Sequence, residues 1–243
     1  MSTIRLTDRE QQELLRAQRA LLSPAAESVA GDDWQLRANR AVREYLGADH
    51  SVFAVPRPDR ELPPMLTEDT DPTMPDRLYE LVEGWRDPYY STTDPYLEFA
   101  IRQRLDGGPD AYHLDELLSP DQQAESTSIQ EVFVPAGMRA MVGLSMPVED
   151  GEATQFFGFE DAAAPGLTER GLRKLSLLVP AFAAGVRTFR SRLDRQADFG
   201  RTLDRLDHPL ALYAADGELL HRNRALQALL LDDADSERIR GAM

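Results

Sequence analysis

A cluster of aromatic side chains is the one concentration of residues in this sequence whose types suit the binding of a small molecule. Tyrosine and tryptophan join an apolar ring to one polar tip, which suits the wall of a pocket for a small apolar or aromatic ligand. Ordinary core packing is the alternative and the commoner role of such residues. The members of this aromatic cluster are Trp85, Tyr89, Tyr90, Tyr96 and Phe99.

A second group of candidate binding residues lies on an alternating stretch from Met138 to Val148, which predicts a strand. One face of this strand is wholly apolar, with Ala140, Val142, Leu144 and Met146. The other, which we call the mixed face, carries Arg139, Met141, Gly143 and Ser145. We expect the apolar face to pack on the terminal helices and the mixed face to look toward the aromatic cluster. Apolar walls with sparse polar anchors are typical of a ligand pocket, so the candidate pocket adds Arg139, Met141 and Ser145 to the aromatic cluster.

Catalytic and metal-binding patterns are missing from the sequence. It has no cysteine, and its four histidines lie far apart without ligand spacing. No phosphate-binding loop, dinucleotide fingerprint or nucleophile elbow occurs. We therefore expect no catalytic residue, no metal and no cofactor, and we do not expect this chain to be an enzyme.

The charge of the chain bears on its partners. Of 243 residues, 42 are acidic and 27 are basic, which gives a net charge of −15. Lys174 is the single lysine. So acidic a chain lacks the basic face that phosphate neutralisation needs, which argues against direct DNA binding. No apolar run is long enough for a membrane span and the start is no signal peptide, so a cytoplasmic location is the default.

A long helix is predicted from Leu167 to Leu206, with Thr168 as its N-cap. Its apolar side chains follow a spacing of three and four residues, which indicates one buried stripe with a repeat of about 3.5 residues. Packing on the chain's own sheet and pairing with a second chain are both open, and the two can coexist. Pro180 predicts a kink near Val179. The predicted dimer seam consists of Leu172, Leu175, Val179, Phe182, Val186, Phe189 and Leu193.

The remaining patterns predict an α+β fold, in which helices sandwich an antiparallel sheet. Capping signals predict helices over Thr7–Leu22 and Asp32–Leu46, and further helices start at Asp71, Asp94 and Ser119. Strands are expected over 50–55 and 154–160, with a hairpin turn at Asp150-Gly151. After the long helix, strands at 209–213 and 218–221 precede a helix over 224–231 that Asn223 caps.

These residues resemble a known family. The run Pro135-Ala136-Gly137-Met138, the residues Val142-Gly143-Leu144, and the stretch from Leu167 to Phe182 are similar to the end of a GAF-like sensor domain of bacterial LuxR-type transcriptional regulators. The tail resembles the start of a PAS domain, in the residues His208-Pro209-Leu210-Ala211-Leu212, Asp216-Gly217 and Asn223-Arg224-Ala225-Leu226.

The resemblance implies three parts: a GAF-like sensor over 1–166, a long signalling and dimerisation helix over 167–206, and a truncated PAS-like ββα start over 207–243. It implies a homodimer that senses an unidentified small molecule, and DNA binding only through a C-terminal domain that is not in this chain. The alternatives are the input region of a signalling enzyme, such as a histidine kinase or a cyclic-nucleotide enzyme, and a ligand-free GAF-fold scaffold.

Overall fold

The computed structural model describes residues 4–24, 32–56, 65–67, 76, 94–95, 110–114, 118–149, 151–213, 217 and 219–231. The chain divides into two compact units, Met1–Phe189 and Arg190–Met243. Within the described ranges, no helix is both long and apolar enough to cross a membrane.

The first unit begins with two helices, α1 (Asp8–Leu22) and α2 (Asp32–Leu46), as the capping signals predict. Thr7 and Glu10 form the expected reciprocal capping box at the start of α1. Gly47 ends α2 in the left-handed region, with a φ of 67°. The indole N–H of Trp34 on α2 donates to the carbonyl oxygens of Ala20 and Leu21, 3.0 and 3.2 Å away, and so fixes the end of α1 against α2.

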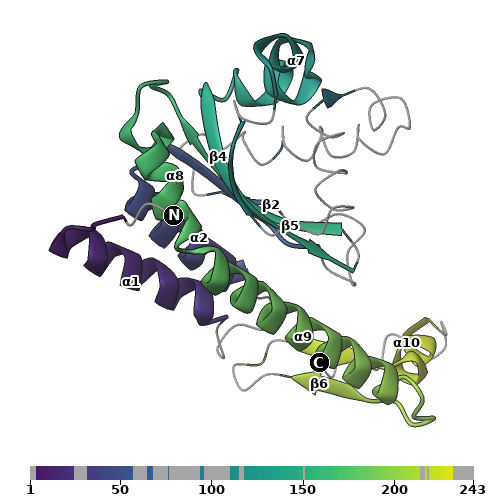
Figure 1. The fold of residues 1–243 in the computed structure, drawn as a ribbon. Coiled ribbons are helices and arrows are strands. Elements are labelled where there is room, and N and C mark those ends of the chain that lie inside the picture. Colours follow the sequence, from purple (N-terminus) through teal and green to yellow (C-terminus); the bar gives the residue numbers. More distant parts are fainter. Residues whose placement is uncertain are drawn as a thin grey trace. The chain divides into compact units, whose positions relative to one another are not determined.

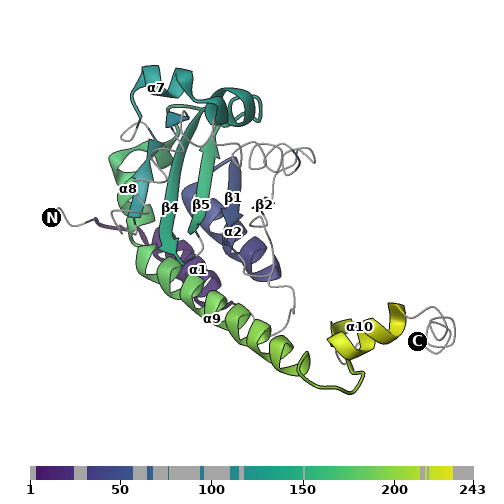
Figure 2. The same cartoon turned by 90° about the vertical axis from the view of Figure 1, so that its right-hand side faces the viewer.

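A five-stranded antiparallel sheet follows, in the order β2-β1-β5-β4-β3, and Figure 2 shows β4, β5 and β1 side by side in this order. The expected hairpin is present, but its turn lies one residue earlier than predicted, because Val148 pairs with Gly151. The mixed helix and sheet agrees with the predicted α+β class. The bounds are β1 (His50–Ala54), β2 (Met65–Thr67), β3 (Asp110–His113), β4 (Ala140–Val148) and β5 (Gly151–Phe159).

The apolar face of β4 belongs to the side of the sheet that the helices cover, as predicted. Leu144 pairs with Gln155, and Gln155 pairs with Phe53, so these three residues share a face. On that face the Gln155 side chain donates to Asn39 of α2 over 3.2 Å, and the Phe53 ring lies 5.8 Å from the Phe182 ring. Figure 1 shows α1, α2 and the first turns of the helix α9 (Val179–Leu203) on this side of the sheet.

The predicted long helix is two helices. α8 spans Glu169–Ser176 and α9 spans Val179–Leu203, with turn residues Leu177 and Leu178 between them. The expected irregularity near Val179 is confirmed, but it starts a new helix instead of kinking a continuous one. Pro180 stands at the second position of α9, where a missing N–H is harmless because the first N–H groups of any helix lack intrahelical partners.

Most of the predicted seam is buried within the single chain. Phe182 packs on Phe53, and the ring of Phe189 lies 4.8 Å from that of Trp34, so both residues hold the first half of α9 on the chain's own core. Pairing between two chains through the same seam stays a prediction. Leu175, Phe182, Val186, Phe189 and Leu193 are buried, whereas Leu172 and Val179 are half-buried.

Two short helices and a 3-10 turn also belong to the described part of the first unit. The predicted helix from Ser119 is divided into α7 (Pro120–Glu125) and the π-helix η1 (Ser128–Phe133). The capping box of Ser119 with Gln122 is confirmed. The 3-10 turn η2 (Pro165–Leu167) leads into α8.

The second unit holds the end of α9 and the expected ββα element: β6 (Ala211–Tyr213), β7 (Leu219–Arg222) and α10 (Arg224–Leu231). Asn223 is fully buried and caps α10 by accepting the Leu226 N–H. The same carbonyl oxygen accepts the Leu210 N–H. Its amide donates to the carbonyl oxygens of Leu203, Leu206 and His208.

Candidate functional site

The register of the sheet continues the mixed face of β4 across the neighbouring strands. Residues directly opposite each other in antiparallel strands share a face. The members that pairing adds to Met141, Gly143 and Ser145 are Thr154, Phe156 and Gly158 on β5, His50, Val52 and Ala54 on β1, and Asp110 and Tyr112 on β3.

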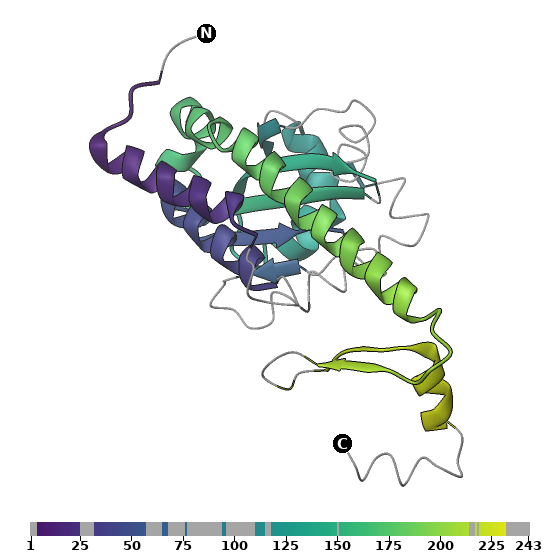
Figure 3. The ribbon, with the colours of Figure 1, turned by 90° about the horizontal axis from the view of Figure 1, so that it is seen from below.

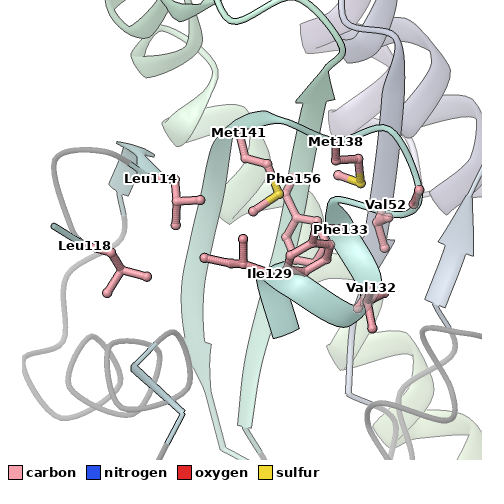
Figure 4. Packing of buried hydrophobic residues seen from close by; sticks show 11 residues of the cluster. Val52, Leu114, Leu118, Ile129, Val132, Phe133, Met138, Met141 and Phe156 are labelled. Carbon is pink, nitrogen blue, oxygen red and sulfur yellow. The ribbon is translucent and has the colours of Figure 1, made fainter. Parts of the chain in front are cut away.

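A buried apolar cluster covers part of this mixed face (Figure 4). The rings of Phe133 on η1 and Phe156 on β5 meet edge to face, with centroids 5.8 Å apart. Met141 is buried in the same cluster, and its role as the wall of a ligand pocket stays a prediction. The other members are Val52, Ala54, Leu114, Leu118, Ile129, Val132, Ala136 and Met138.

Two glycines of the mixed face make room for larger side chains. A Cβ at position 143 would stand 2.3 Å from Cζ of Tyr112, and one at position 158 would stand 2.5 Å from Cγ of Met138. The Tyr112 ring therefore lies directly over Gly143, between Met141 and Ser145 along the strand. Tyr112 is a residue that the sequence analysis missed, because the four-residue strand β3 is too short to give an alternating pattern.

Ser145 is a buried polar residue of this face. Its side chain is 2% exposed, and its Oγ has no hydrogen-bond partner in the described part of the chain. A buried hydroxyl left without a partner costs about 1–3 kcal/mol. Ser145 therefore offers one donor and one acceptor on a face that is otherwise mostly apolar, an arrangement that suits the anchoring of a polar group on an apolar ligand.

Asp94 fixes the start of η1. Its side chain is 3% exposed and accepts three hydrogen bonds, from the Ser128 N–H at 2.9 Å, the Ser128 hydroxyl at 2.7 Å and the Ser126 hydroxyl at 2.9 Å. π-Helical turns are often found at functional sites, and this one supplies Ile129, Val132 and Phe133 to the apolar cluster. The sequence analysis treated Asp94 only as a helix start, since nothing in the sequence linked it to serines about thirty residues away.

The predicted site residues have three outcomes. Met141 and Ser145 lie on one buried face. Arg139 precedes β4 and its side chain is exposed. Trp85, Tyr89, Tyr90, Tyr96 and Phe99 lie outside the described residues.

No cluster of three or more His, Asp or Glu side chains that could hold a metal ion occurs among the residues that the structure describes.

Comparison with known proteins gives matches among solved structures. No protein-family model and no curated protein match this chain. The ligand-binding domain of VqsR from Pseudomonas aeruginosa is 14% identical with a TM-score of 0.47, over 77% of this chain and 99% of that one. CepR2 from Burkholderia cenocepacia, an N-acylhomoserine lactone dependent LuxR family transcription factor, is 16% identical with a TM-score of 0.45, over 76% of this chain and 98% of that one.

Residues 1–171 of SdiA from Escherichia coli are 17% identical with a TM-score of 0.42, over 74% of this chain and 94% of that one. Among these matches, CepR2 is a LuxR family transcription factor, the type of regulator that the sequence resembles. The description of the two parts as GAF-like and PAS-like stays a prediction.

Proposed function

We propose that this chain is the sensory region of a LuxR-type transcriptional regulator, not an enzyme, and that it binds a small molecule on the mixed face of its sheet. The observation that carries the proposal is the buried hydroxyl of Ser145, which has no hydrogen-bond partner among the described residues, beside the apolar side chains of Met141 and Phe156. The ligand would have an apolar body and a polar group within reach of that hydroxyl. In this proposal the first part is GAF-like and the last part PAS-like, and the protein acts in the cytoplasm.

The relay would run through the sheet. Val52 and Ala54 point to the mixed face, while Phe53 between them points to the opposite face and contacts Phe182 of α9. A ligand that shifts β1 would therefore press on α9 through this one strand. Such coupling requires that the ligand bind two arrangements of α9 with different affinities. Output would come from the DNA-binding domain of the regulator.

We further propose a homodimer. Phe182 and Phe189 are buried within the chain, so pairing would use the exposed apolar side chains farther along, Phe199 and Leu206, which are 57% and 45% exposed. Sedimentation equilibrium of the whole chain should give a dimer, and the double substitution Phe199→Glu with Leu206→Glu should give a monomer. A dimer that survives both substitutions would contradict pairing through these residues.

The ligand proposal is tested with a probe that has an apolar chain and hydroxyl groups, octanoyl-rac-glycerol, in isothermal titration calorimetry. Ser145→Ala should weaken its binding about fivefold, the loss of one net hydrogen bond of about 1 kcal/mol. Ser176→Ala is the matched control, because the Ser176 hydroxyl lies on the exposed surface of α8 and donates to Leu172 of its own helix. Native mass spectrometry of the freshly purified protein complements the probe. If the protein carries no small molecule and does not bind the probe, the ligand proposal fails.

A further inference from the structure

The backbone hydrogen bonds of an ordinary α-helix are interrupted at the junction between α8 and α9. The N–H groups of Leu177 and Leu178 bond to the carbonyl oxygens of Lys174 and Leu175, three residues back. Pro180 has no N–H to donate to Ser176, four residues before it. The bonds that continue an ordinary helix are therefore incomplete at this point, and carbonyl groups at the end of α8 need other donors.

Side chains from α1 and α2 donate to two carbonyl groups at this point. The amide of Gln18 on α1 donates to the carbonyl oxygen of Leu177 over 3.4 Å. The hydroxyl of Tyr45 on α2 donates to the carbonyl oxygen of Lys174 over 3.3 Å.

α1 also contacts the helices on both sides of the junction. On the α8 side, the carboxylate of Glu10 lies 2.9 Å from the Arg170 guanidinium and 3.5 Å from Nζ of Lys174. On the α9 side, the carbonyl oxygen of Leu21 lies so close to Gly185 that only glycine fits there. Figure 3 shows α1 running beside the first turns of α9.

We propose that the α8–α9 junction is a hinge and that α1 is a splint that fixes its angle. The splint holds α8 through Glu10, the junction through Gln18 and α9 through the contact of Leu21 with Gly185. Release of α1 loosens the restraint on the angle between α8 and α9, while Phe182 and Phe189 still pack on the core. The inference concerns residues of the first unit only and does not depend on a ligand, so its failure would leave the proposed sensing function untouched.

The test measures the angle as a distance in the whole chain. Because the chain has no native cysteine, cysteines at the exposed positions Glu169 and Thr188 accept spin labels without competition. Electron–electron double resonance should give one narrow distance distribution in the otherwise unchanged protein. Adding Gln18→Leu and Tyr45→Phe should broaden the distribution at least twofold, while circular dichroism shows that the fold is kept. An unchanged distribution in the folded variant overturns the hinge.

A matched control uses the same chemical change on the same helix. Gln11→Leu removes an amide that donates to Leu6, next to the start of α1, and it should leave the distribution narrow. Broadening by Gln11→Leu equal to that by Gln18→Leu would also overturn the proposal, because it would show general loosening of α1.

The single lysine gives a second readout for the splint. Lys174 is 15% exposed, donates to the Tyr45 carbonyl oxygen over 3.3 Å and lies over the Tyr45 ring. Acetic anhydride acetylates its amine and releases acetate, and mass spectrometry of the peptide that contains it gives the rate. Gln18→Leu should speed this reaction at least threefold, with the urea-unfolded chain as the fully reactive reference. A rate equal to that of the unsubstituted protein would overturn the role of α1 as splint.

Discussion

The backbone carbonyl of Leu21 at the end of α1 meets Gly185 of α9 so closely that a Cβ at position 185 would stand 2.1 Å from its oxygen. The carbonyl cannot easily move aside, since it also accepts the indole N–H of Trp34 over 3.2 Å. Trp34 in turn packs on Phe53 and Phe189. The contact between the Leu21 carbonyl and Gly185, in which no side chain takes part, thus limits how closely α1 and α9 approach each other.

Gly185→Ala should destabilise the protein, although alanine is normally the better helix former. The new methyl group must push two helices apart, so we expect the free energy of unfolding to fall by about 1–3 kcal/mol in urea titrations. Gly200→Ala on the same helix is the control, because its Cβ would meet only the His221 ring, at 3.4 Å. That substitution should be neutral or stabilising, and equal effects of the two would contradict the tight contact.

Asp94→Asn should also destabilise the protein. The carboxylate accepts from Ser126 and twice from Ser128, whereas an amide has one acceptor oxygen and would turn its NH₂ toward a donor. We expect a loss of about 1–3 kcal/mol in the free energy of unfolding. Asp121→Asn, at an exposed position in the first turn of α7, is the control and should change stability by less than about 0.5 kcal/mol.

Gly143→Ala should destabilise the mixed face, because the added Cβ would overlap the Tyr112 ring. We expect about 1–3 kcal/mol in the free energy of unfolding. In a double-mutant cycle, Tyr112→Leu should remove most of this cost, since the shorter side chain leaves space over position 143. Additive effects of the two substitutions would show that Tyr112 does not lie over Gly143 in solution.

Glu10 gives the protein a stability term that depends on pH. A hydrogen bond from the Thr7 backbone N–H is the largest cause that lowers the pKa of Glu10 from 4.5 to about 2, with further contributions from Arg170 and Lys174. Because the folded state lowers this pKa, the stabilisation is complete above the unfolded value of 4.5 and is lost as the pH falls toward 2.

The Glu10→Gln variant should therefore be less stable than the unsubstituted protein by about 1 kcal/mol at neutral pH, and the difference should vanish toward pH 2. Urea unfolding at several pH values measures it. Glu13→Gln removes a partner of Arg9 alone, an ion pair on the surface, and should show a smaller difference. A Glu10 difference that stays constant down to pH 2 would contradict the lowered pKa.

Features that depend on residues close together in the sequence could be predicted. The capping boxes of Thr7 with Glu10 and Ser119 with Gln122, the β4–β5 hairpin and the interruption before Pro180 all depend on neighbours along the chain. For this reason α1, α2, the pairing of the hairpin and the ββα element were predictable, with bounds shifted by a few residues.

Contacts between residues far apart in the sequence could not be predicted. The three-and-four spacing from Leu172 to Leu193 shows that a helix buries one stripe, but it does not tell which surface covers that stripe. Here Phe182 and Phe189 meet rings of β1 and α2. Asp94 comes within hydrogen-bond distance of Ser126 only after folding. The same holds for Tyr45 and the carbonyl of Lys174, which are 129 residues apart. The hydroxyl of Ser145 was predicted as part of a mixed face, but only the structure shows that it has no hydrogen-bond partner in the described ranges.

Asn223 uses every hydrogen-bonding group of its side chain on backbone atoms between Leu203 and Leu226. The amide side chain of Asn223 therefore forms hydrogen bonds with the last carbonyl of α9, with residues before β6 and with the first turn of α10. Within the second unit, a rotation of the end of α9 would therefore be resisted by the Asn223 hydrogen bonds unless the ββα element turns with it.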